Sequence, residues 1–247
     1  KSKGVVKHGT NTGDNERFMQ MFWESNEKGW VPCAKGGQEA WMIPRVDKKI
    51  NWLENGKEIK RYGPSKPSSI EHYFKEGITY TVAKETGRRF GYMHNSCAFD
   101  AKGSAIIPND DLWRVLSYLN SSLVTYLMIG QTPGRMWQIG TVSKLPWPEE
   151  LEESNVLTDS SKKIASLILT KKIYDITSTF FISNFLLPEG QKIKRESHTQ
   201  NPLREIFRSI GTNRKFDSKK IHKFKDIYIK FKRYINNIDL KILDEYT

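Results

Sequence analysis

Cysteine is scarce in this sequence, and its placement excludes the kinds of site that cysteines usually build. The 247 residues include only Cys33 and Cys97, which lie far apart and belong to no CxxC or Cys/His grouping. Two isolated cysteines are typical of buried free thiols in a reduced, intracellular protein, so we expect a cytoplasmic protein. The five histidines show no metal-ligand spacing with each other or with the cysteines, and no metal site is predicted.

Catalytic motifs are missing as well. The sequence contains no GxSxG, HExxH, Walker loop or GxGxxG. It also lacks the Asp/Asn-Pro-Pro-aromatic motif with which an amino-methyltransferase holds its target nitrogen. The nearest match, Asn201-Pro202-Leu203, has neither the second proline nor the aromatic residue. We therefore predict no catalytic residue and no cofactor site in this chain, and no enzymatic activity of the chain alone.

A membrane span is not expected. The most apolar stretch, residues 164–187, is interrupted by Lys171, Lys172 and Asp175, and charges at these positions argue against a transmembrane helix. The chain opens with KSKGVVKHGTNTG, which has neither an apolar leader segment nor an initiating Met. From the missing Met we expect a fragment of a longer protein.

Positive charge is what the sequence has in excess. The formal net charge is +12 and the sequence pI is about 9.5, while 37% of the residues are hydrophobic. The chain is therefore expected to fold around a core rather than to be a disordered polycation. A positive field of this size favours polyanionic partners, above all nucleic acid.

Residues 135–148, RMWQIGTVSKLPWP, separate two regions of different composition. All seven tryptophans lie at or before Trp147, in a region patterned as short strands, turns and helices. The region beyond is basic, Trp-free and helical in pattern. We predict an α+β fold, with a mixed, mostly antiparallel domain over residues 1–148 and a basic helical domain over residues 149–247. Residues 135–148 themselves are expected to form a loop and a closing strand.

Short elements joined by turns are predicted in the first domain. In order, they are a short helix capped by Asp14 or Asn15 with Phe18, Met21 and Phe22 inward, two strands around the Gly36-Gly37 turn, a hairpin at Asn55-Gly56, and strands over residues 78–82 and 88–108. A single helix is predicted over residues 110–130, because apolar residues recur there at helical spacing. Its expected buried stripe consists of Leu112, Val115, Leu116, Leu119, Leu123, Tyr126 and Leu127.

Helices dominate the predicted second domain. They cover residues 160–185, residues 202–211, and about twenty residues from Asp217 or Ser218 onward. The last of these carries an apolar stripe on one face and lysines on the others. Such charged helix faces are usually solvated, and the alternative is a surface that contacts the phosphate backbone.

Side chains suited to nucleic acid occur in several places. Arg88 and Arg89 supply guanidinium forks, and Tyr92 and His94 follow with ring faces, which are types that read base edges. A solvated hairpin tip would show the same types, so both interpretations stay open. Phosphate contacts are suggested at a helix N-terminus, beside a glycine pair and on the last helix. These candidates are Thr12, Arg17, Lys35, Lys219, Lys220, Lys223 and Lys230, and their structural alternatives are a helix cap, a glycine turn and a solvated face.

Seven blocks of the first domain occur in the order of a known family. They are TGDNERF (12–18), W-x-P-x-x-KGG (30–37), INW-x-x-NG (50–56), YFKEGITY (73–80), FDAKGSAIIP (99–108), LSYLNSSLVTYL (116–127) and IGTVSKLPWP (139–148). Together they resemble the C-terminal target recognition region of large adenine-specific DNA methyltransferases, such as the PglX proteins of BREX phage-defence systems and related type IIG restriction-modification enzymes. The helical remainder resembles the family only in layout.

The resemblance implies a parent enzyme that transfers a methyl group from S-adenosylmethionine to an adenine N6 flipped out of double-stranded DNA. This chain would select the adenine, and an upstream methyltransferase domain or subunit would hold the cofactor and the catalytic motifs. Other defence-system proteins are further expected partners. The resemblance assigns phosphate contact to Lys144 and base reading to Arg88, Arg89, Tyr92, His94, Gln131, Arg135 and Gln138.

Two other classes of function stay open. In one, the chain is a stand-alone specificity subunit that recruits a separate methyltransferase or nuclease. In the other, it is a protein-interaction module whose basic face binds a defence component. DNA affinity measured against salt concentration separates nucleic-acid binding from the interaction module.

Overall fold

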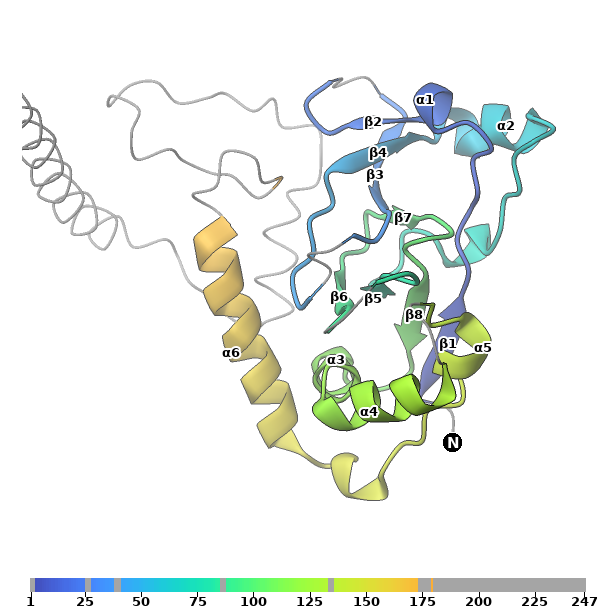
Figure 1. The fold of residues 1–247 in the computed structure, drawn as a ribbon. Helices are drawn as coiled ribbons and strands as arrows, with labels where there is room; N and C mark the ends of the chain where they lie inside the picture. Colours follow the sequence, from blue (N-terminus) through green and yellow to red (C-terminus); the bar gives the residue numbers. More distant parts are fainter. Residues whose placement is uncertain are drawn as a thin grey trace, which may run out of the picture.

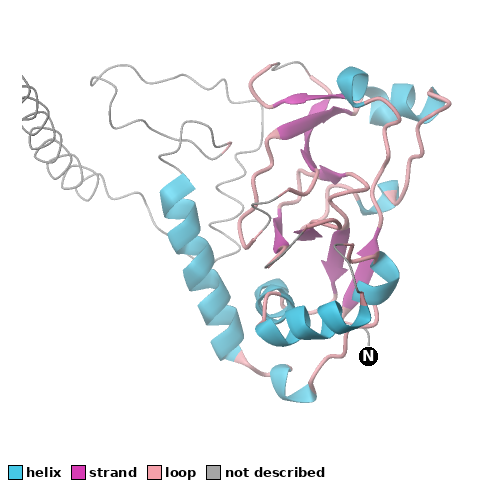
Figure 2. Ribbon diagram, viewed as in Figure 1, coloured by secondary structure: helices cyan, strands magenta, loops and turns pink. Residues whose placement is uncertain are grey.

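The computed structural model describes residues 3–24, 28–37, 41–84, 88–132, 136–172 and 179. Within these residues the α+β prediction is confirmed, since two four-stranded sheets lie together with helices along one end (Figures 1 and 2). Most pairings in both sheets are antiparallel. None of the helices in this part of the chain is long and apolar enough to cross a membrane.

The first sheet has the strand order β1-β8-β5-β6. Its strands are β1 (Gly4–Lys7), β8 (Ala105–Pro108), β5 (Gly77–Tyr80) and β6 (Phe90–Met93). All residues of β5 and β6 are buried, so both strands are covered on both faces, as uninterrupted apolar strands usually are. The outer strand β6 also exchanges backbone hydrogen bonds with Met42. The predicted strand positions in residues 78–82 and 88–108 are confirmed, and these strands form the centre of the molecule.

The second sheet has the order β2-β4-β3-β7 and contains one parallel pair. Its strands are β2 (Met19–Met21), β4 (Lys48–Asn51), β3 (Trp30–Ala34) and β7 (Ala98–Phe99). The parallel pair, β3 with β7, places Cys33 opposite Ala98. A core cluster that includes Phe18, Ile50 and Phe99 fills this half of the domain.

Two loops that carry blocks of the sequence resemblance interlock beside this sheet. The Asp100 carboxylate accepts the N–H groups of Lys102 and Gly103 at 2.8 and 3.0 Å, and it pairs with Lys35 at 3.0 Å. A Cβ atom on Gly103 would lie only 2.3 Å from the Ala34 carbonyl oxygen, so this close approach requires glycine. The loops at residues 35–37 and 100–103 therefore form one structural unit.

Helices cover the end of the first sheet (Figure 1). They are α3 (Leu112–Leu119), α4 (Ser122–Gln131), the short α5 (Ile139–Val142) and α6 (Asn155–Lys172), with a 3-10 turn η2 (Glu149–Leu151) between the last two. The Asp111 carboxylate caps α3 by accepting the Arg114 N–H at 2.7 Å, and it also accepts the Thr158 hydroxyl of α6 at 3.0 Å. Ala165 and Leu169 of α6 lie in the core of the first sheet. The domain boundary predicted at residue 148 stays a prediction, because residues 173–178 and 180–247 lie outside the described residues.

The predicted hairpin at Asn55-Gly56 is wrong. Residues 54–56 adopt positive φ and ψ and form the first turn of the helix α2 (Leu53–Arg61). The Trp52 ring covers Gly56, where an added Cβ would lie 2.8 Å from a ring carbon, and Ile59 is buried in the core. An Asn-Gly pair favours positive φ in general, which serves a helical entry as well as a hairpin turn.

The first two predicted helices also need correction. The helix capped by Asp14 is only α1 (Asn15–Phe18), after which the chain extends into β2. The helix predicted over residues 110–130 is two helices, because the Asn120 side chain bonds the Phe90 carbonyl at 2.9 Å and Ser121 caps α4 through the Val124 N–H. This break turns the second half of the expected stripe outward.

The closing strand predicted within residues 135–148 is also wrong. Gln138 stands at the start of α5, and only an isolated bridge pairs Met136 with Ala83. Lys3 lies 5.5 Å from the centroid of the Trp147 ring, and Tyr118 donates its hydroxyl to the Pro146 carbonyl. Residues 145–147 therefore pack as a fixed connection toward α6.

Candidate nucleic-acid interface

Two stretches that are distant in sequence meet at the edge of the first sheet. The Trp137 N–H donates to the Val82 carbonyl at 2.8 Å, and Met136 pairs antiparallel with Ala83. The loop after β5 therefore lies against the loop that leads into α5. Arg88 and Gln138 belong to these two loops. The structure therefore brings together two stretches that the sequence analysis proposed separately as base-reading candidates.

Arg89 is buried between these two loops. Its guanidinium donates to the carbonyls of Thr81, Val82 and Lys84 at 3.4, 3.3 and 3.2 Å, and it lies 3.7 Å from the centroid of the Trp137 ring. Burial lowers the pKa of Arg89 to about 10, which leaves the guanidinium charged near neutral pH. Arg89 is only 2% exposed, so this position does not support the prediction that it reads a base edge.

Arg88, by contrast, is exposed. Its guanidinium carbon lies 5.1 Å from the centroid of the Trp41 ring, and its backbone carbonyl accepts the Lys84 ammonium at 2.6 Å. An arginine held over an aromatic face keeps a preferred direction while its fork stays accessible. We call the surface formed by Ala83, Lys84, Arg88, Met136 and Gln138 the two-loop surface.

The other candidate residues in and beside residues 135–148 are exposed where the structure describes them. Gln131 is the last residue of α4, Gln138 precedes α5 without making a side-chain cap, and Lys144 lies just after α5. Arg135 lies outside the described residues. Gln138 belongs to the two-loop surface, whereas Gln131 at the end of α4 and Lys144 after α5 lie outside it.

Tyr92 and His94 are core residues rather than surface readers. The Tyr92 ring stacks on Trp113 at 5.2 Å, and its hydroxyl donates to Glu76 at 2.6 Å. His94 lies 2.6 Å from the Ser96 hydroxyl through Nδ1 and 3.2 Å from the Cys97 sulfur through Nε2. Burial lowers the pKa of His94 to about 4. Both side chains are almost fully buried, so neither can reach a base in this conformation.

Two of the predicted phosphate contacts have structural partners. Thr12 is buried, and its hydroxyl donates to the Asn15 side chain at 2.9 Å. Lys35 pairs with Asp100 at 3.0 Å and also donates to Asn15 at 3.0 Å. The helix-cap and glycine-turn interpretations are therefore the ones that the geometry favours at these positions. Lys219, Lys220, Lys223 and Lys230 lie outside the described residues.

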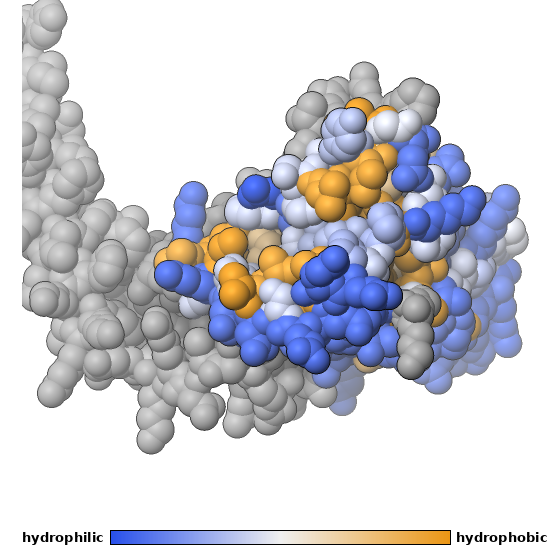
Figure 3. Space-filling view, turned by 90° about the horizontal axis from the view of Figure 1, so that it is seen from below, coloured by the Kyte–Doolittle hydropathy of each residue, from blue (hydrophilic) through white to orange (hydrophobic). Residues whose placement is uncertain are grey.

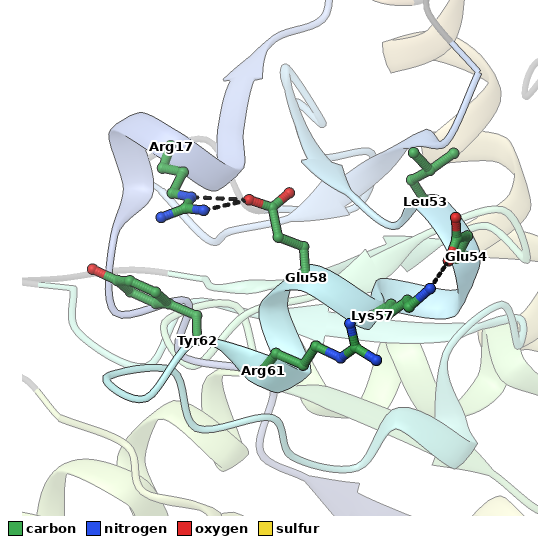
Figure 4. Close-up of a pocket in the computed structure, with 7 residues that line it drawn as sticks. All are labelled: Arg17, Leu53, Glu54, Lys57, Glu58, Arg61 and Tyr62. Carbon is green, nitrogen blue, oxygen red and sulfur yellow. Dashed lines mark hydrogen bonds and ion pairs between the residues drawn. The ribbon is translucent and has the colours of Figure 1, made fainter.

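Arg17 lines a groove of about 360 Å³ between α1 and α2 (Figure 4). Its guanidinium points at Glu58 and pairs with it at 2.7 Å, while Lys57 pairs with Glu54 at 2.5 Å. Leu53, Arg61 and Tyr62 complete the lining. Since two of its three cations are paired within it, the groove is no strongly positive phosphate site, and Arg17 serves mainly to join α1 to α2.

No metal-binding cluster occurs in the part of the chain that the structure describes. Cys33 and Cys97 are buried free thiols, as predicted, and burial raises the pKa of both. A buried thiol with a raised pKa is a poor nucleophile and a poor metal ligand. Neither cysteine is therefore a candidate nucleophile or metal ligand in this structure.

Helix α4 exposes several large apolar residues. Leu123, Tyr126 and Ile129 of α4 are 50%, 78% and 63% exposed, and α4 contains no charged residue. Figure 3 shows hydrophobic patches on the face seen from below, set among strongly hydrophilic residues. A contiguous exposed apolar face of this kind is typical of protein-contact surfaces.

Comparison with known proteins gives one informative match. No family model matches the chain. Over 138 residues the chain is 31% identical to the adenine-specific methyltransferase BrxX of Escherichia coli O9:H4 (strain HS), a match that covers 54% of this chain and 11% of that protein. The chain is related to a BREX-type adenine-specific methyltransferase. The matched part is therefore a small fraction of that relative's length.

Trp41, Met136 and Trp137 make contacts at the two-loop surface for which sequence patterns assigned them no role. Their roles depend on pairings with Arg88, Ala83 and Arg89, which are distant in sequence. The available signal was the concentration of tryptophan beside arginine-rich stretches, because aromatic rings and guanidinium groups pair readily.

Proposed function

We propose that this chain is a sequence-specific double-stranded DNA recognition module of an adenine-N6 DNA methyltransferase in BREX-type phage defence or restriction-modification. The two-loop surface is the observation that carries the proposal. It combines the Arg88 guanidinium, held over the Trp41 ring, with the exposed Gln138 side chain, on two loops that are joined by the Ala83–Met136 bridge. The relationship to a methyltransferase and the net charge of +12 support it.

The proposed division of labour follows from the side-chain chemistry. An arginine fork pairs with the O6 and N7 atoms of guanine, and a glutamine amide pairs with N6 and N7 of adenine in the major groove. Arg88, Gln138, Gln131 and Arg135 would read bases in this way. Lys144 and the lysines of residues 219–230 would contact phosphates, which position a protein on DNA without reading its sequence.

Methyl transfer would belong to another region of the parent enzyme. That region would bind S-adenosylmethionine and receive the adenine after it has been flipped from the duplex. A recognition module contributes by fixing where on the duplex the flipped base lies. The stand-alone specificity subunit is the same role carried out on a separate chain.

A protein-contact role is favoured for α4 by its exposed apolar face. The partner that we propose for it is the methyltransferase domain or subunit. Tyr126→Lys should weaken association with that domain, measured with the two parts expressed as separate chains, and should leave duplex binding unchanged. An unaffected association would exclude α4 as the contact.

Methylation-site sequencing tests the proposed function directly. Arg88→Ala and Arg135→Ala are introduced into the parent enzyme, and the methylated adenines are mapped across a genome. We expect relaxed or altered sites for at least one variant, because each bidentate base contact discriminates by about 1–3 kcal/mol. Unchanged sites and unchanged DNA affinity in both variants would refute the assignment.

A further inference from the structure

Arg89 joins the two loops from which the candidate base contacts project. Three of its hydrogen bonds go to backbone carbonyls of residues 81–84. Its guanidinium also lies 3.7 Å from the centroid of the Trp137 ring. One buried side chain therefore touches both halves of the two-loop surface.

The candidate base contacts are the covalent neighbours of this buried pair. Arg88 directly precedes Arg89, and Gln138 directly follows Trp137. The backbone hydrogen bond from the Trp137 N–H to the Val82 carbonyl, at 2.8 Å, joins the two loops that carry these residues. Any shift of Arg89 relative to Trp137 would therefore change the spacing between the Arg88 and Gln138 side chains.

The contact depends on the shape of the guanidinium as well as on its charge. A guanidinium is planar and can stack on a ring face while its N–H groups donate in the plane. A lysine ammonium is a compact, strongly hydrated charge that cannot do both in the same geometry. Arginine is therefore specifically required for this arrangement.

We propose that Arg89 is a positioning residue for sequence selectivity, which touches no DNA itself but fixes the spacing of Arg88 and Gln138. This inference rests on the proposed recognition function. It predicts that Arg89 variants bind duplex DNA with ordinary salt dependence while losing their preference among sequences. A merely structural residue would change thermal stability without changing the sequences that the folded protein prefers.

The test uses the full 247-residue chain and a pool of duplexes with a randomised centre. Wild type, Arg89→Lys and Arg114→Lys are each carried through rounds of binding and sequencing. Arg114→Lys is the matched control, since Arg114 is also mostly buried, with 14% side-chain exposure, and pairs with Asp110 on α3. We expect Arg89→Lys to reduce the enrichment of the preferred sequence about tenfold, the equivalent of one base contact, and Arg114→Lys to leave it unchanged.

A second variant covers the case in which Arg89→Lys does not fold. Trp137→Leu keeps an apolar side chain but removes the ring face, and it should lower the enrichment in the same way. Faster hydrogen exchange of the residue-137 amide in the folded variants should accompany the loss. If a variant that folds enriches the preferred sequence as strongly as the wild type, the role of Arg89 is overturned but the proposed recognition function is not. No enrichment by the wild type would overturn the proposed recognition function, and the role of Arg89 with it.

Discussion

The buried imidazole of His94 predicts a specific loss of stability in mild acid. Nδ1 accepts the Ser96 N–H at 3.3 Å and lies 2.6 Å from the Ser96 hydroxyl, while Nε2 faces the Cys97 sulfur at 3.2 Å. This network suits a neutral ring with its proton on Nε2. Protonating Nδ1 would bury a charge and remove an acceptor from the Ser96 amide.

The magnitude follows from the pKa of His94, which burial lowers from 6.5 to about 4. The folded state binds fewer protons than the unfolded state between these values, so stability falls as the pH falls. The whole shift corresponds to about 3 kcal/mol, of which about 2 kcal/mol is lost between about pH 8 and about pH 5. Below about pH 4 the ring is protonated in both states, and this contribution to the pH dependence ends.

Urea denaturation at a series of pH values measures this loss. His94→Asn keeps an acceptor oxygen near the position of Nδ1, so the variant should be less stable near neutral pH but nearly independent of pH down to about pH 5. His8→Asn, at an exposed position, is the control and should follow the wild-type curve. Wild-type and His94→Asn curves that run parallel over this range would refute the role of His94.

Further predictions concern the recognition surface and the interlocked loops. Arg88→Ala should lower affinity for the preferred duplex about tenfold or more while the melting temperature stays unchanged, as checked by fluorescence anisotropy and calorimetry. Gly103→Ala should destabilise the fold by about 2 kcal/mol or more in urea denaturation, whereas Gly140→Ala, with open space around the added methyl group, should be neutral or slightly stabilising. Lys35→Met should cost about 1–3 kcal/mol because it leaves the Asp100 carboxylate buried without its cation, and Lys144→Met at an exposed site should cost almost nothing. Equal effects of the paired variants would contradict these assignments.

Local sequence signals predicted the elements whose contacts are also local. The positions of strands β5, β6 and β8 follow from short apolar stretches bounded by turn residues, and the capping of α1 follows from Asp14. The helix predicted from residue 110 onward begins at Leu112, after its cap Asp111. Each of these depends on residues within a few positions of one another.

Elements determined by distant contacts could not be predicted in the same way. The break between α3 and α4 depends on the bond from Asn120 to the Phe90 carbonyl, on a strand far away in sequence. The helical entry at Gly56 depends on the Trp52 ring that covers it. Periodicity alone predicted one helix where α3 and α4 are separate. Turn chemistry alone predicted a hairpin at Asn55-Gly56, where α2 begins.

The candidate site shows the same division. Residue types pointed to the stretch around Arg88 and to the stretch around Gln138, and the structure pairs the loops that carry them; their roles in base reading stay predictions. Residue type alone could not distinguish the exposed arginine from the buried one. Arg88 is exposed over Trp41, whereas Arg89 is buried against Trp137. Both residues precede β6 (Phe90–Met93), and only the fold shows which of the two side chains is covered.

Duplex binding by the chain as a function of salt concentration tests the central claim most directly. We expect measurable binding to double-stranded DNA, with an association constant whose logarithm falls linearly with the logarithm of the salt concentration. The slope should be about −3 or steeper, because several lysines and arginines would contact phosphates. Arg88→Ala should bind more weakly than wild type in the same titration. No measurable duplex binding at low salt would contradict the account and would favour the protein-interaction module.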